Sequence, residues 1–150
     1  MNPSWLRCLA NASPPHYCRA PFGETSPTAV KVIGMDQLLS AGDDLIFQLE
    51  SGFGLLRVLA VDHERHVWHL IAYEELFPDV ESAELALADA SALHVRKAHM
   101  ALTNRAFERT PAARLGNRPV TESELASYEK WIGDDGEISD RSALLMLGMR

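Results

Sequence analysis

Three histidines in the middle of the chain have a spacing that could bind a metal ion. His63, His66 and His69 follow the pattern H-x-x-H-x-x-H, and Asp62 directly precedes them. On an α-helix these side chains would lie near one face and could bind zinc. The residues from His66 to Tyr73, however, are rich in β-branched and aromatic types and favour a strand. Side chains three apart in a strand point to opposite faces, so we predict a hairpin tip with one partly buried histidine.

Two other segments contain metal-ligand residue types without a complete ligand set. Cys8, His16 and Cys18 offer three candidate ligands, whereas a structural zinc site usually takes four. The run Asp134–Asp140 is similar to a calcium loop, but its first and last loop positions would lack carboxylates. We therefore expect no bound metal and no cofactor.

Signatures of common catalytic sites are also missing from the sequence. There is no phosphate-binding loop, no G-x-G-x-x-G motif and no G-x-S-x-G nucleophile motif. The leading interpretation is therefore a non-enzymatic protein-binding domain. One alternative is a hydrolase or metal-dependent enzyme that uses histidines between His63 and His99. Another is a structural accessory domain.

Charge is the feature of the sequence that bears most directly on partners. The formal net charge is −7, which disfavours nucleic acid and anionic membranes because both are polyanions. From Thr121 to Asp140 there are seven acidic residues and one basic residue, Lys130. From Val95 to Val120 there are six basic residues and one acidic residue, Glu108. Complementary charge steers association, so we expect a basic protein partner. The candidate partner-binding residues are Glu122, Glu129, Asp134, Asp135 and Glu137.

The pattern of apolar residues predicts an antiparallel meander followed by mixed elements. Strands are expected at 45–49, 55–61 and 66–73, with turns between them. A short helix at 81–90 and a returning strand at 93–102 follow. Residues 103–120 are interpreted as an irregular connection with one helical turn at 104–108. The apolar run 143–147 is expected to pack on the core as a strand or helix.

The best-marked helix spans residues 121–132. Thr121 and Glu124 form a capping box, in which each side chain bonds to the backbone amide of the other residue. Leu125, Tyr128 and Ile132 repeat at helical spacing and predict the buried face. Gly133 is expected to end the helix.

The whole pattern predicts an α+β fold, built on a curved antiparallel sheet or small open barrel with two or three short helices. Residues 1–34, which hold five of the eight prolines, are interpreted as a flexible tail, and residues 35–150 as a single globular domain. Met35 is an alternative natural start. Both cysteines lie within the tail, and no secretory signal or membrane span is visible, so we expect a cytoplasmic protein.

The sequence from about residue 41 to 120 resembles small β-rich immunity proteins of bacterial polymorphic toxin systems. The likeness rests on Gly42-Asp43 before Leu45-Ile46-Phe47, a glycine turn, Leu56-Arg57-Val58-Leu59 and a strand ending in Ala72-Tyr73. Leu115 to Val120 also resembles a recurrent late element of such families. The resemblance implies a curved antiparallel sheet that binds and blocks a cognate toxin. It assigns no functional residues.

Overall fold

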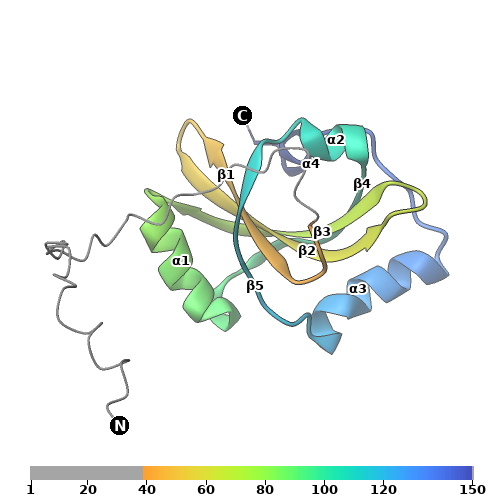
Figure 1. Ribbon diagram of the computed structural model, residues 1–150, viewed down its shortest axis with the longest axis horizontal. Helices are drawn as coiled ribbons and strands as arrows, with labels where there is room; N and C mark the ends of the chain where they lie inside the picture. The colour runs from red at the N-terminus through yellow and green to blue at the C-terminus, as the bar shows by residue number, and fades with distance from the viewer. Residues whose placement is uncertain (1–38, 150) are drawn as a thin grey trace, which may run out of the picture.

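The computed structural model describes residues 39–149, which form one sheet with helices on both of its faces (Figure 1). The interpreted tail and the residues that follow it up to 38 lie outside the described residues. The strands are β1 (Asp43–Leu49), β2 (Gly52–Asp62), β3 (Val67–Phe77), β4 (Val95–Thr103) and β5 (Ala112–Asn117). The helices are α1 (Val80–Ala88), the 3-10 turn η1 (Ala90–Ala92), α2 (Asn104–Glu108), α3 (Glu122–Gly133) and α4 (Ala143–Leu147).

The strands form an antiparallel sheet in the order β4-β3-β2-β1-β5. β1, β2 and β3 make the predicted meander, and the sheet curves without closing, so the α+β fold with an open curved sheet is confirmed (Figure 1). In the β1–β2 register Asp44 lies directly opposite Arg57. This pairing brings an acid and a base together on one face of the sheet, because residues opposite each other in a ladder point the same way.

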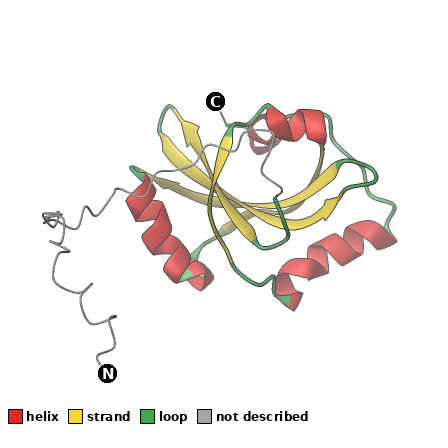
Figure 2. Ribbon diagram, viewed as in Figure 1, coloured by secondary structure: helices red, strands yellow, loops and turns green. Residues whose placement is uncertain are grey.

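Successive side chains along a strand point to opposite faces of the sheet, so each face has its own core. On one face Leu45, Leu56 and Leu70 pack beneath α2 and α4. On the other, Ile46 and Ile71 belong to a second cluster that includes residues of α1 and α3. Figure 2 shows these two pairs of helices on opposite sides of the strands. None of the helices within residues 39–149 is long and apolar enough to cross a bilayer.

Strand β5 is the main departure from the predicted elements. The interpretation of residues 103–120 as an irregular connection is wrong for Ala112–Asn117, which pairs with β1. This segment, AARLGN, has little intrinsic β-preference, so its strand is imposed by the partner strand. The helical turn at 104–108 is confirmed as α2, and the run 143–147 as helix α4.

Candidate functional site

The five predicted partner-binding residues are all exposed. Glu122 and Glu129 lie seven residues apart on α3, which is close to two full turns, so they share one side of the helix. Asp134, Asp135 and Glu137 follow directly after the helix. Within residues 39–149 none of their carboxylates forms a hydrogen bond or ion pair with another side chain. We call this group, Glu122, Glu129, Asp134, Asp135 and Glu137, the acidic face.

An exposed apolar residue lies beside the acidic face. Ile132, predicted to be buried, is 56% exposed, so that part of the predicted helix face is wrong. The capping box of Thr121 and Glu124 is present as predicted. The orientation of α3 is set by Glu124, which reaches Arg57, and by Trp131, which contacts histidines on the sheet. These two contacts hold another side of α3 against the sheet, so Ile132 is turned out of the core.

The three histidines that suggested a metal site are dispersed. His63 and His66 are exposed in the hairpin between β2 and β3, where His66 adopts a positive φ of 55°. His69 lies in β3 and is buried. Within residues 39–149, no group of three or more His, Cys, Asp or Glu side chains could hold a metal ion. This includes the segment Asp134–Asp140. Cys8, His16 and Cys18 lie outside the described residues.

The buried histidine has a partner that sequence spacing did not reveal. Nδ1 of His69 lies 3.0 Å from Nε2 of His99 on β4. Tyr128 and Trp131 of α3 cover the pair, with ring centroids 4.6 Å and 4.8 Å from that of His69. Burial lowers the pKa of His69. Burial, and then the charges of His69 and Lys97, lower the pKa of His99 to about 4. Both rings are therefore neutral near pH 7, and one donates to the other.

Arg57 is the centre of a buried polar network that sequence reasoning missed. Its side chain is 1% exposed. Nη1 donates to Asp44 at 3.0 Å and to the carbonyl of Gly42 at 3.2 Å. Nη2 donates to the carbonyls of Arg118 and Pro119 at 3.1 and 2.8 Å. Nε lies 2.7 Å from a carboxylate oxygen of Glu124, as an ion pair without hydrogen-bond alignment. Arg57 thus joins β1, β2, the β5–α3 segment and the first turn of α3.

Arg118 completes this network from the other side of Asp44. Its Nε and Nη2 donate to the two oxygens of Asp44 at 2.6 and 2.8 Å, a bidentate pair that raises the pKa of Arg118. Burial raises the pKa of Tyr73 and outweighs the opposing influence of Arg118 and Arg57. For Glu124, burial raises the pKa, but hydrogen bonds from Thr121 and the charge of Arg57 outweigh it, and the pKa is lowered overall. Arg118 and Glu124 are therefore ionised at neutral pH, whereas Tyr73 is not.

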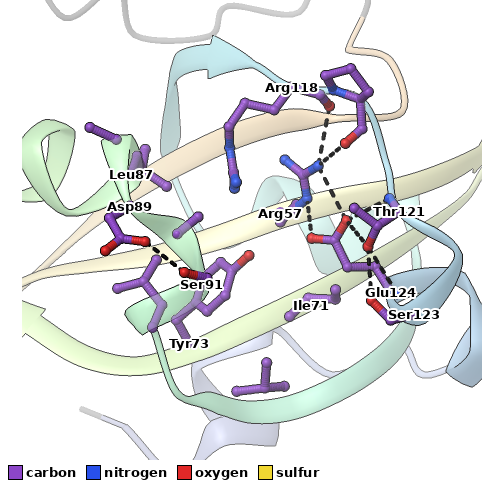
Figure 3. Close-up of a pocket in the computed structure, with 15 residues that line it drawn as sticks. Arg57, Ile71, Tyr73, Leu87, Asp89, Ser91, Arg118, Thr121, Ser123 and Glu124 are labelled. Atoms are coloured by element: carbon purple, nitrogen blue, oxygen red, sulfur yellow. Dashed lines mark hydrogen bonds and ion pairs between the residues drawn. The ribbon is translucent and has the colours of Figure 1, made fainter.

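A cavity of about 520 Å³ opens beside this network (Figure 3). Asp89 and Ser91 line it from the end of α1 and from η1, and Thr121, Ser123 and Glu124 line it from the start of α3. Tyr73 and Ile71 of β3 contribute to the wall between them. The volume falls within the range of roughly 300–1,000 Å³ that is usual for small-molecule sites.

Two of the six basic residues between Val95 and Val120 are paired with buried carboxylates. Arg114 pairs with buried Asp43 at 3.0 Å, and Arg118 with Asp44. Their charges are thereby compensated, whereas those of the acidic face are not. The candidate sites are the acidic face and the cavity. Comparison of the chain with protein-family models, with curated proteins and with solved structures finds no match.

Proposed function

We propose that this domain is a non-enzymatic binding protein that docks a basic protein partner through the acidic face. The observation that carries the proposal is the contrast between two sets of carboxylates. Those of Asp43, Asp44 and Glu124 each meet an arginine. The five of the acidic face are exposed and uncompensated within the described residues. Negative charge concentrated on one surface raises the rate at which a positive partner is captured.

Ile132 supplies the apolar component that a stable interface requires. Docking surfaces typically combine an apolar centre, which carries much of the binding free energy, with a polar rim that adds steering and specificity. Ile132 follows Glu129 by three residues and precedes Asp134 by two, so acidic residues flank it on both sides. Its 56% exposure leaves apolar area available for burial by a partner.

The resemblance to immunity proteins suggests what kind of partner this is. The open curved sheet with few helices agrees with the fold that the resemblance implies. On this proposal the basic partner is a toxin domain, and binding neutralises it by covering its positive surface. The buried histidine pair has a packing role here, because Tyr128 and Trp131 cover both rings.

Charge reversal on the acidic face tests the electrostatic part of the proposal. The partner is first captured by the wild-type full chain from its native cells, and its association is then followed by surface plasmon resonance. Glu129→Lys combined with Asp134→Lys should slow association by about tenfold at low salt and flatten the salt dependence. Asp134 caps the C-terminal end of α3, where a lysine interacts favourably with the helix dipole, so the fold should be preserved.

The matched control reverses two acidic residues outside the acidic face, Glu50→Lys with Glu84→Lys. This variant has the same net charge as the reversed one and should lose much less of the association rate. If both variants associate equally slowly, only net charge matters and the assignment of the acidic face is wrong. An unchanged rate in the Glu129/Asp134 variant would also contradict it.

Replacing Ile132 tests the apolar part separately. Ile132→Gln keeps good helix propensity and should accelerate dissociation by about tenfold or more, as expected for a residue near the centre of an interface. The control is Leu85→Gln on α1, which removes an even more exposed side chain, at 75%, on a different helix. Dissociation rates measured for the same captured partner should change only for Ile132. Equal effects from both substitutions would exclude Ile132 as an anchor.

A further inference from the structure

The cavity between α1, β3 and the start of α3 has a chemistry separate from that of the acidic face. Its lining residues carry two positive charges, on Arg57 and Arg118, and two negative ones, on Glu124 and Asp89. Each guanidinium is already paired with a carboxylate. Asp89 has no cationic partner within residues 39–149, so an anionic ligand would meet its like charge. A cationic ligand would instead meet Arg57 and Arg118, which line the same cavity. The charge balance favours an uncharged ligand.

Hydrogen-bond donors reach the cavity from one part of its wall. The four hydrogens on Nη1 and Nη2 of Arg57 are taken up by carbonyls and carboxylates. Nε of Arg57 lies against Glu124 as an ion pair without an aligned hydrogen bond. Arg118 holds Asp44 through Nε and Nη2, which leaves Nη1 outside that bidentate pair. Tyr73 lines the same cavity, and its hydroxyl can donate a hydrogen bond to a ligand.

Acceptors line the α1 side of the same cavity. The hydroxyl of Ser91 donates to Oδ1 of Asp89 at 2.6 Å, which fixes the serine hydrogen and leaves its lone pairs free. The second oxygen of Asp89 has no hydrogen-bond partner within residues 39–149. Figure 3 shows Asp89 and Ser91 on the opposite side of the cavity from Thr121 and Glu124. A ligand group here must donate hydrogen bonds.

Apolar side chains complete the wall and define the rest of the ligand. Ile71, Leu87 and Leu93 line the cavity along with the ring of Tyr73. Such a lining, mostly apolar with a few convergent polar groups, is typical of small-molecule sites.

We propose that this cavity binds a small, uncharged ligand that combines a carboxamide group with an apolar body. The carbonyl oxygen of the ligand accepts from Arg118 and Tyr73. Its amide N–H groups donate to Ser91 and Asp89, and its body packs on Ile71 and Leu87. This site lies outside the acidic face and is independent of the proposed partner.

Three probes of nearly identical shape test the proposal: benzamide, benzoate and benzamidinium. Benzoate lacks the donor, and benzamidinium lacks the acceptor and is charged. Each is titrated into the ¹⁵N-labelled full chain at neutral pH, and amide chemical shifts are followed by NMR. Benzamide should bind with a millimolar Kd and shift amides around Tyr73 and Ser91. Both charged analogues should bind about tenfold more weakly, because each leaves one set of cavity groups unpaired.

Two single-atom variants make the test specific to the cavity. Tyr73→Phe and Ser91→Ala should each weaken benzamide by about fivefold, equivalent to about 1 kcal/mol for one lost hydrogen bond. Ser51→Ala in the β1–β2 turn serves as the control and should leave Kd unchanged. Ser91 is exposed, so its variant remains informative even if Tyr73→Phe fails to fold.

Several results would overturn the proposal. Benzoate or benzamidinium binding as tightly as benzamide would show that charge balance does not select the ligand. No saturable shift with benzamide at tens of millimolar would show that the cavity is not a carboxamide site. Unchanged affinity in folded Tyr73→Phe and Ser91→Ala would place the probe elsewhere. None of these results bears on the acidic face, whose test uses the protein partner alone.

Discussion

Replacing Arg57 by methionine should lower the free energy of unfolding by about 3–5 kcal/mol, the range observed when one member of a buried ion pair is removed. Methionine fills most of the volume but cannot donate to the carbonyls of Gly42, Arg118 and Pro119. It also leaves Glu124 without its ion-pair partner, while Asp44 keeps Arg118. Urea unfolding followed by tryptophan fluorescence measures the loss.

Two further variants distinguish the effect of losing the buried network from the effect of losing a positive charge. Arg65→Met removes an arginine of an ion pair whose side chain is 69% exposed, and it should cost no more than about 0.5 kcal/mol. Adding Glu124→Gln to Arg57→Met removes the unpaired carboxylate and should restore part of the loss, since residues in one network are coupled. A loss for Arg57→Met no larger than that for Arg65→Met would contradict the role assigned to the network.

The sequence predicted those elements whose local signals agree with their tertiary setting. Strands β1 to β3 are rich in apolar, β-branched and aromatic residues, and helix α3 begins with a capping box that the structure contains. Strand β5 could not be predicted in this way. Its alanines, arginine and glycine favour no strand by themselves, and only pairing with β1 orders them. Long-range pairing of this kind leaves little trace in a single sequence.

The candidate sites show the same difference between local and long-range signals. The exposure of the five acidic residues could be predicted from residue type alone, and all five are exposed. Arg57 was missed, although a lone arginine within LLRVLAV is itself a signal, since a buried arginine requires partners. The His69–His99 contact joins residues 30 apart on neighbouring strands, and spacing within one strand could not reveal it. Ile132 was misplaced because helix periodicity gives an apolar stripe, whereas two polar and aromatic contacts determine the rotation of α3.

Acidification from pH 7 toward pH 4.5 should destabilise the protein by about 2 kcal/mol through the histidine pair alone. The ordinary histidine pKa is near 6.5, whereas that of folded His99 is about 4 and that of His69 is also lowered. Between these values the unfolded chain binds protons that the folded chain does not. The stability is therefore complete above about pH 6.5 and is lost as the pH falls toward 4.

The groups around the pair do not reverse this direction. Asp62 favours a charge on His69, but Arg65 opposes it and burial dominates. Lys97 and His69 both disfavour a charge on His99. On the α3 side the two rings are covered by aromatic side chains, Tyr128 and Trp131. Acid should therefore weaken the attachment of α3 to the sheet first.

Unfolding free energies of wild type and His99→Gln, measured in urea at half-unit steps from pH 7.5 to 4.5, test this expectation. Glutamine can still exchange a hydrogen bond with His69 but does not titrate, so the variant should have a visibly flatter profile. His63→Gln, in the exposed hairpin, should follow the wild-type profile. The pKa of Glu124 is lowered, and this residue is present in all three proteins, so it affects the difference between variants little. Parallel profiles for wild type and His99→Gln would show that the histidine pair is not what acid disrupts.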